Sequence, residues 1–216
     1  ILSLDNQNIL ELGCGDASLT RLVATGGSNR HITAMEVDTI QHEKNLLIDD
    51  LPLVTFTLAG SEDIPAEDNQ FDTVFMFKSL HHVPVNKMTL AVEEIHRVLK
   101  PGGYAYISEP VFSGDFNEVL RLFHDEEQVR HAAFKSVEGA VSIQLFTLKN
   151  QLFFNTPKQF NDFSEFTERV IDVTHNQHKL SEDLMSQVRE KFNQTIARNQ
   201  GNFLNPIRVG LLQHIS

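Results

Sequence analysis

The sequence has a single cysteine, no tryptophan and no long apolar run. Because Cys14 is alone among the 216 residues, an internal disulfide and a cysteine-based metal cluster are both excluded. No segment approaches the roughly 18 uninterrupted apolar residues of a membrane span, and no charged start precedes an apolar signal segment. We therefore expect a cytoplasmic protein outside the membrane. The first residue is Ile1 instead of Met, which leaves open an N-terminal segment before it.

Basic side chains are also scarce. Lys and Arg number 18 against 29 Asp and Glu, which gives a formal net charge of -11, and the acids are spread along the chain. A polyanion such as DNA would be repelled by this charge, so we expect no nucleic acid partner. The ten histidines include no H-x-x-x-H pair, so we expect no metal site. The sequence does not indicate an oligomeric state.

The first half of the chain alternates between two patterns. Apolar, β-rich runs at residues 8–13, 31–38, 53–60, 71–79 and 103–111 are separated by helical patterns. One such pattern is the helical spacing of Met88, Val92, Ile95 and Leu99, for which Asn86 is the predicted N-cap. Strands joined by helical crossovers predict an α/β fold, a doubly wound and mostly parallel sheet with helices on both faces.

In the second half the regular alternation of strand and helix patterns ends, and we expect this half to be an extension of the same domain. Residues 115–144 and the stripe of Leu184, Val188, Phe192 and Ile196 predict helices, while residues 145–154 and 206–214 predict strands, which brings the sheet to seven. Asp162 and Glu165 form a possible capping box. We predict one domain over residues 1–216, with a cofactor-binding half (1–111) and a substrate-covering half (112–216).

The residues that carry chemistry begin with "ILELGCGDASLT", positions 9 to 20. A strand that enters a helix through a glycine loop commonly binds part of a nucleotide. A dinucleotide fingerprint needs a third glycine, and Ser18 stands there instead. Glu11 would repel a pyrophosphate by roughly 1 to 4 kcal/mol at about 4 Å and would favour an ammonium group. The ligand indicated by this loop is therefore a cationic one.

A second acid, Glu36, further restricts the class of ligand that the sequence indicates. Glu36 ends the second predicted strand about 20 positions after the glycine loop, where an acid commonly accepts hydrogen bonds from ribose hydroxyls. A ligand with both a ribose and an amine is implied. S-adenosylmethionine has both, because its adenosine carries the ribose and its methionine portion carries the ammonium.

At this point the chain resembles the class I S-adenosylmethionine-dependent methyltransferases, in the subgroup related to ubiquinone and menaquinone biosynthesis enzymes. The similar segments are "ILELGCGDASLT", "AMEVD", "SEDIPAEDNQFDTVFMFKSLHHV" and "EEIHRVLKPGGYAYISEP", which together run from about residue 9 to 110. The resemblance implies the Rossmann-like methyltransferase fold and S-adenosylmethionine as cofactor. The predicted cofactor-binding residues are Glu11, Gly13, Cys14, Gly15, Glu36, Val37, Ser61, Glu62, Phe77 and Lys78.

The roles that the resemblance implies differ along this set. Glu11 lies near the methionine amino group, Glu36 binds the ribose, and Val37 packs near the adenine. The family often has an Asp that receives the adenine amino group, whereas this sequence has Gly60 there, so Glu62 or backbone groups take that role instead. Cys14 is expected to be a small packed residue without chemistry of its own.

Three residues are candidate bases. His81 and His82 follow the fourth predicted strand, and Glu109 ends the fifth. Methyl transfer depends mainly on positioning and needs a base only where the acceptor must lose a proton. The alternative is that one His packs under the loop, the other is exposed, and Glu109 is a capping or solvated acid.

Two features of the second half also have alternative interpretations. Arg130 could contact an acceptor carboxylate, but a solvated helix face is the more common setting for such a residue. Of the 16 Phe, 12 lie beyond residue 110, where they could line a lid or, as we prefer, fill a core.

The predicted function is methyl transfer from S-adenosylmethionine to a small-molecule acceptor that the sequence does not identify. The alternative is a catalytically silent S-adenosylmethionine-binding module that serves a partner protein. A nicotinamide oxidoreductase is disfavoured by Ser18 and Glu11.

Overall fold

A computed structural model describes residues 2–172 and 180–215 of the chain. The described residues divide into two compact units: those of unit 1 lie within residues 1–109, 131–152 and 209–216, and those of unit 2 lie within residues 110–130 and 153–208. The described part of residues 112–216 therefore contributes to both units. The single domain divided at residue 111 stays a prediction.

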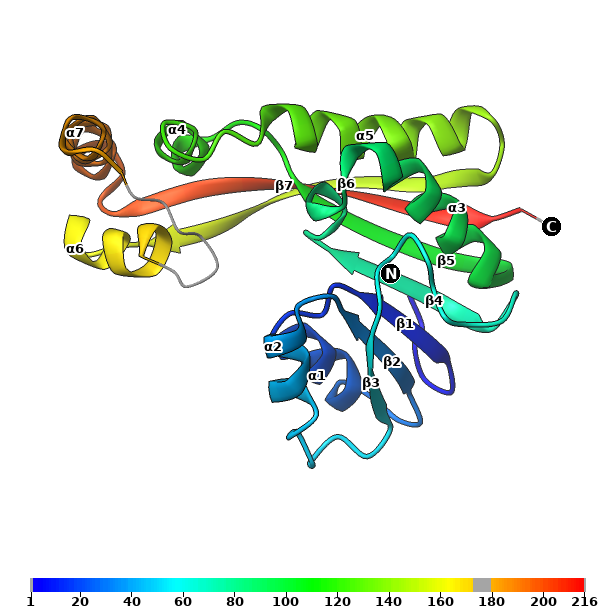
Figure 1. Ribbon diagram of the computed structural model, residues 1–216. Helices are drawn as coiled ribbons and strands as arrows, with labels where there is room; N and C mark the ends of the chain where they lie inside the picture. Colours follow the sequence, from blue (N-terminus) through cyan, green and yellow to red (C-terminus); the bar gives the residue numbers. More distant parts are fainter. Residues whose placement is uncertain (1, 173–179, 216) are drawn as a thin grey trace. The chain divides into compact units, whose positions relative to one another are not determined.

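Seven strands form one sheet in the order β3-β2-β1-β4-β5-β7-β6 (Figure 1). Their bounds are β1 (Asn8–Leu12), β2 (His31–Glu36), β3 (Val54–Leu58), β4 (Phe71–Phe77), β5 (Leu99–Pro110), β6 (Phe146–Gln159) and β7 (Asn202–His214). Each predicted strand is present. The sheet confirms the expected seven-stranded α/β architecture.

The strands from β3 to β5 pair in parallel. The last two strands run antiparallel, as their contacts show. The Phe160 amide donates to the Gly201 carbonyl oxygen at 3.1 Å, and Thr156 donates to the Asn205 carbonyl oxygen at 3.0 Å, so residue numbers rise on one strand and fall on the other. The sheet is thus mostly parallel, as expected.

The helices that follow the strands have these bounds: α1 (Ser18–Thr25), α2 (Thr39–Asn45), α3 (Met88–Val98), α4 (Asp115–Leu120), α5 (Glu127–Ser142), α6 (Phe163–Phe166) and α7 (Glu182–Asn199). Two short 3-10 helices are η1 (Leu80–His82) and η2 (Val85–Lys87), and η3 (Thr167–Ile171) is a short π-helix. No helix in the described residues has the length and apolar character needed to cross a bilayer.

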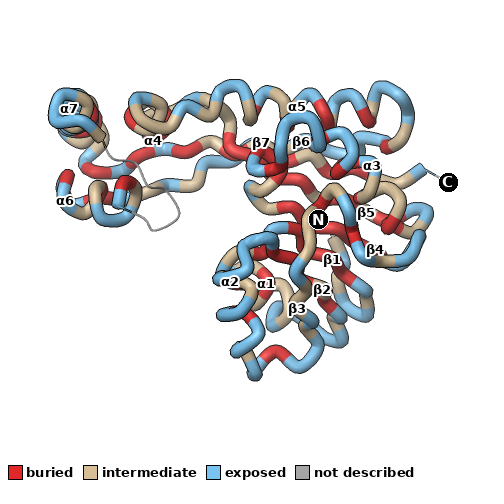
Figure 2. The backbone as a smooth tube through the Cα atoms, in the orientation of Figure 1, coloured by how far each residue is buried: buried red, intermediate tan, exposed pale blue. Residues whose placement is uncertain are grey.

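The central strands of unit 1 are buried on both faces (Figure 2). On one face, Ile9 and Phe75 pack with Val23 of α1. Leu10 and Leu12 point to the opposite face and are no more than 1% exposed. Parallel sheets require such cover because neither face can remain solvated.

Unit 2 has a phenylalanine core. The fully or nearly buried members are Phe116, Phe160, Phe163, Phe166, Phe192 and Phe203. Phe192 lies 5.0 Å from Phe166 and 5.2 Å from Phe203 between ring centroids. These rings fill a core, as preferred from the sequence, so they do not line a lid.

Residues 115–144 are helical, as expected, and form two helices because the chain turns between α4 and α5. Two other local expectations were wrong. Asn86 lies inside η2, so Lys87 occupies the N-cap position of α3 without a side-chain cap bond. Arg130 is buried and not solvated: it pairs with Glu126 at 2.5 Å and donates to Asn117 at 3.0 Å.

The core of unit 2 gives a first prediction. Phe192→Ala should lower the free energy of unfolding by about 3 to 5 kcal/mol, because it leaves a cavity among packed rings. Phe153→Ala, at a ring that is 64% exposed, is the matched control and should change it by about 0.5 kcal/mol or less. Urea denaturation of the whole chain measures both. Equal losses would contradict the assignment of this core.

Candidate functional site

The predicted cofactor residues lie at the carboxyl ends of neighbouring strands of unit 1 or just after them. β1 lies between β2 and β4, with Leu12 opposite Met35 on one side and Met76 on the other. The chain runs from β1 outward to β3 and then returns to β4, so the strand order reverses between β1 and β4. Ligands of open α/β sheets bind at such a reversal.

The glycine loop after β1 depends on both of its glycines. Gly13 has φ +70°, and a Cβ there would lie 2.7 Å from the Cβ of Ser79, so the loop can approach the end of β4 only with glycine. The Ser79 hydroxyl donates to the Leu12 carbonyl oxygen at 2.8 Å and joins the two strand ends. Gly15 has φ +54° and faces open space, with no atom within 4 Å of the position that a Cβ would take. A ligand can therefore reach the backbone at Gly15.

Glu36 binds the glycine loop to the end of β2. Its Oε2 accepts from the Gly15 amide at 2.8 Å, and its Oε1 accepts from the amides of Val37 at 2.8 Å and Asp38 at 3.0 Å. An ionised carboxylate has about four acceptor positions. These three bonds leave one position, on Oε2, for a further donor.

Asn45 also holds the loop, and the sequence analysis did not find it. The side chain is 1% exposed, donates from Nδ2 to the Gly15 carbonyl oxygen at 2.8 Å and lies 3.5 Å from the Cys14 sulfur. Gln41, one helical turn earlier, donates to its Oδ1 at 2.9 Å. The one feature of the sequence that could have indicated this role is the i, i+4 spacing of the two amide side chains, Gln41 and Asn45.

Two side chains at this loop, Glu11 and Cys14, have raised pKa values. Burial raises the pKa of the Glu11 carboxyl to about 7, and the Thr20 hydroxyl partly opposes that shift. Burial, followed by the charges of Glu11 and Glu36, raises the pKa of the Cys14 thiol to about 12. The thiol therefore stays protonated, which agrees with the expectation that Cys14 has no chemistry.

The segment after β3 places Glu62 against Gly60. A Cβ at Gly60 would lie 2.6 Å from Glu62 Oε2, so the carboxyl group occupies the space beside the glycine. Lys87 donates to Glu62 Oε1 at 2.9 Å, and this bond is the largest cause of the lowered pKa of Glu62. Ser61 is buried, whereas Val37 is 65% exposed.

The end of β4 supplies the other predicted contacts. Lys78 has φ +55° and donates its amide to the Ser108 carbonyl oxygen at 2.7 Å. The Phe77 ring is half-buried and stacks on Phe75 with centroids 5.0 Å apart. Both residues are at the strand end, as expected, and their contacts with a ligand stay a prediction.

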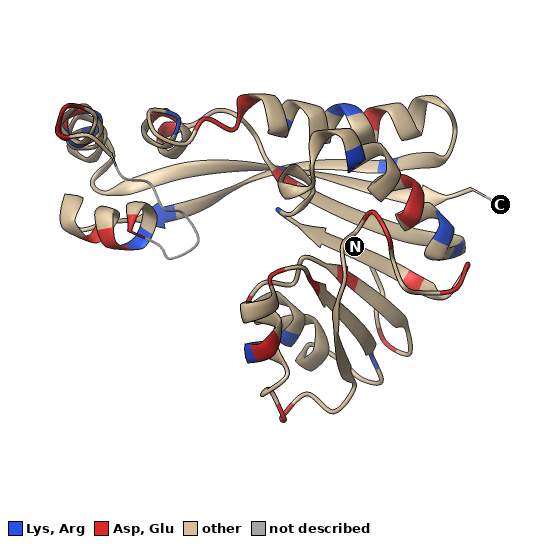
Figure 3. Ribbon diagram, in the orientation of Figure 1, with Lys and Arg blue, Asp and Glu red and all other residues tan. Residues whose placement is uncertain are grey.

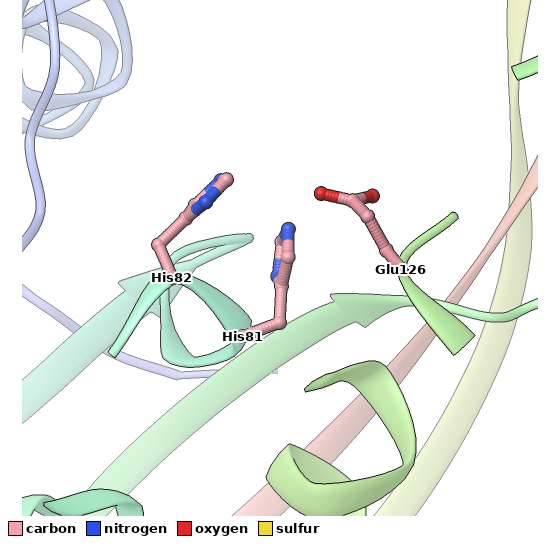
Figure 4. Close-up of side chains that lie close together, drawn as sticks. All are labelled: His81, His82 and Glu126. Carbon is pink, nitrogen blue, oxygen red and sulfur yellow. The ribbon is translucent and has the colours of Figure 1, made fainter. Parts of the chain in front are cut away.

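The candidate bases are close together on η1 and β5. His81 Nδ1 lies 2.5 Å from Glu109 Oε2, and Glu109 Oε1 accepts from the Leu80 amide at 2.9 Å. His81 and Glu109 are each buried. The rings of His81 and His82 lie side by side with centroids 4.1 Å apart (Figure 4). The alternative is right that one His is buried and the other exposed, but Glu109 is not solvated.

Comparison with known proteins agrees with this geometry. A model of the "methyltransferase domain" family matches residues 10–107. An uncharacterized methyltransferase of Mycobacterium tuberculosis is 35% identical over 98 residues, which cover 45% of this chain and 37% of that protein. The ubiquinone/menaquinone biosynthesis C-methyltransferase UbiE of Brucella canis is 34% identical over 125 residues, 55% of this chain and 44% of that one. The chain thus spans less than half the length of these relatives.

The solved structures extend the similarity to the whole chain. The YcgJ protein of Bacillus subtilis superposes with a TM-score of 0.67 over 99% of this chain and 93% of that one, at 17% identity. At that identity the likeness concerns the fold alone. Residues 10–107, which contain the glycine loop and the acid of β2 at the reversal of the sheet, are thus similar to the methyltransferase domain family.

Proposed function

We propose that the protein transfers a methyl group from S-adenosylmethionine to a small-molecule acceptor. The observation that carries the proposal is the arrangement of the glycine loop around Glu36, with an open approach at Gly15. The cofactor supplies an electrophilic methyl group when bound. The remaining argument concerns what the residues of this chain do.

The residues of the loop fit such a ligand. The acceptor position left on Glu36 Oε2 suits a ribose hydroxyl, and the space beside Gly15 admits a ligand to within hydrogen-bonding distance of the backbone. A Cβ at Gly15 would narrow that approach.

Glu11 favours a cationic group over a phosphate. The shift of its pKa from 4.5 to about 7 corresponds to roughly 3 kcal/mol that burial costs the ionised form. A ligand ammonium would recover part of this energy by pairing with the carboxylate, whereas a pyrophosphate would increase the cost. The buried acid is therefore evidence against a dinucleotide.

Glu62 is the proposed partner of the adenine amino group. Its carboxyl group lies beside Gly60, at the place where a side chain of residue 60 would begin. The bond from Lys87 lowers its pKa and keeps it an acceptor. Ser61 and the exposed Val37 are the other proposed contacts on this side.

His81 and Glu109 are proposed to act together on the acceptor. A carboxylate that accepts from Nδ1–H leaves Nε2 as the basic nitrogen of the ring and fixes the orientation of the ring. Nε2 could then take the proton of an O–H or N–H acceptor as the methyl group is transferred. His82, whose ring adjoins His81, is the second candidate.

A small-molecule acceptor is supported by the relatives and by charge. UbiE is a C-methyltransferase of ubiquinone and menaquinone biosynthesis. The formal charge of -11 disfavours nucleic acid as acceptor. A chain that binds the cofactor and yields no methylated product in an acceptor screen would instead be the silent binding module.

The ribose contact is tested by Glu36→Ala. The affinity for S-adenosylhomocysteine, measured by titration calorimetry, should fall by about 1 to 3 kcal/mol, because a charge-assisted hydrogen bond is lost. Glu43→Ala, an exposed acid on α2, is the matched control and should leave the affinity unchanged. Wild-type protein that binds NADH but not S-adenosylhomocysteine would overturn the proposed function.

Glu11 predicts a pH dependence of the same affinity. The carboxyl group is protonated below its pKa of about 7, so affinity for S-adenosylhomocysteine should fall by up to about tenfold for each pH unit below 7. Glu11→Gln should bind more weakly at pH 8 and flatten the dependence. Because the folded chain binds this proton more tightly than the unfolded chain, stability without ligand should decrease as pH rises through 7. An unchanged pH profile in the variant would remove Glu11 from the site.

The proposed base pair is tested by turnover with an acceptor found in a screen. His81→Ala and Glu109→Gln should each lower kcat by about 100-fold or more, with a smaller effect on cofactor affinity. His31→Ala, an exposed histidine at the start of β2, is the control. Equal losses of kcat and cofactor affinity would indicate that the pair only supports the fold of the site.

A further inference from the structure

The loop between β3 and β4 carries Ser61 and Glu62, and its own packing is sparse. We call residues 59–70 the adenine-side loop. Ile64 is its one large apolar side chain, 3% exposed, while residues 67–70 are all exposed. A segment that buries so little apolar surface gains little free energy to offset the entropy of ordering its backbone. Other contacts must therefore hold it.

Arg97 of α3 supplies these contacts with every N–H that its side chain has. A guanidinium has five N–H donors in a planar fork. In Figure 3 the ribbon of α3 is coloured both red and blue, because the helix carries residues of both charges. The five acceptors of Arg97 are the Ile64 carbonyl oxygen (2.9 Å), the Ala66 carbonyl oxygen (2.7 Å), Asp68 Oδ1 (2.9 Å), and Glu94 Oε1 and Oε2 (both 2.7 Å).

Glu94 completes the arrangement from the same helix. Its Oε2 accepts from the Ile64 amide at 3.0 Å, so Arg97 and Glu94 hold both backbone polar groups of Ile64. The Arg97 carbonyl oxygen accepts from the Asn69 amide at 2.9 Å. The loop is thus fixed to α3 at four residues, Ile64, Ala66, Asp68 and Asn69.

We propose that Arg97, together with Glu94, positions the adenine-side loop so that Ser61 and Glu62 meet the adenine of the cofactor. The inference rests on the proposed function, because it assumes that this loop binds adenine. Arg97 bonds the loop and not the ligand, so it is a positioning residue. Lysine cannot replace it, since three donors on one nitrogen cannot span two carbonyl oxygens and both oxygens of Glu94.

The experiment compares S-adenosylhomocysteine with adenosine as ligands of the whole chain. Arg97→Lys should weaken both by the same factor, about tenfold, as expected for a loop that holds its binding conformation about a tenth of the time. An equal loss of affinity for both ligands would show that the defect lies on the adenine side of the site, because adenosine lacks the methionine portion. A defect at the glycine loop would affect S-adenosylhomocysteine more.

Arg30→Lys is the matched control. Arg30 also donates hydrogen bonds both to backbone carbonyl groups and to an acid. Its acceptors are the Val23 carbonyl oxygen at 2.7 Å, the Gly26 carbonyl oxygen at 3.1 Å and Asp5 at 2.9 Å. It precedes β2, at the opposite end of the strand from Glu36. Its loss should lower the melting temperature without changing either affinity.

The outcomes separate this inference from the proposed function. Wild-type protein that binds neither ligand overturns the proposed function and the inference with it. Wild-type binding with unchanged Arg97→Lys affinities, or with equal losses in Arg30→Lys, overturns the inference alone. If Arg97→Lys does not fold, Glu94→Gln replaces it and should weaken both ligands severalfold by the same factor, whereas unchanged binding overturns the inference.

Discussion

The site depends on one carboxylate that is surrounded by backbone amides. Glu36 accepts from the amides of Gly15, Val37 and Asp38, so the glycine loop, the end of β2 and the start of α2 share one anchor. Asp38 then caps α2 through the amides of Ile40 and Gln41. A single acid thus fixes the conformation of two loops while it keeps an acceptor position for a ligand.

The architecture of unit 1 could be predicted because its determinants are local. Alternating apolar runs and helical stripes depend on neighbouring residues, and so does the glycine loop that joins β1 to α1. The order of the strands and the position of Glu36 then follow from the rules of doubly wound sheets.

Contacts between distant segments could not be predicted in this way. Arg130 has the sequence context of a solvated helix, but its bond to Asn117 becomes visible only when the turn between α4 and α5 is known. Asn45 and Arg97 likewise act on loops about 30 residues away. Each of these two side chains donates to a backbone carbonyl oxygen of its loop. Such contacts produce no periodic pattern in the sequence.

The burial of Cys14 affects how readily its thiol can be oxidised or alkylated. Oxidation and alkylation of cysteine proceed through the thiolate and require access to solvent. A sole thiol that is 6% exposed, with a pKa of about 12, offers neither. The glycine loop therefore contains a sulfur atom that serves as packing, and reagents that modify cysteine can reach it only after the loop opens.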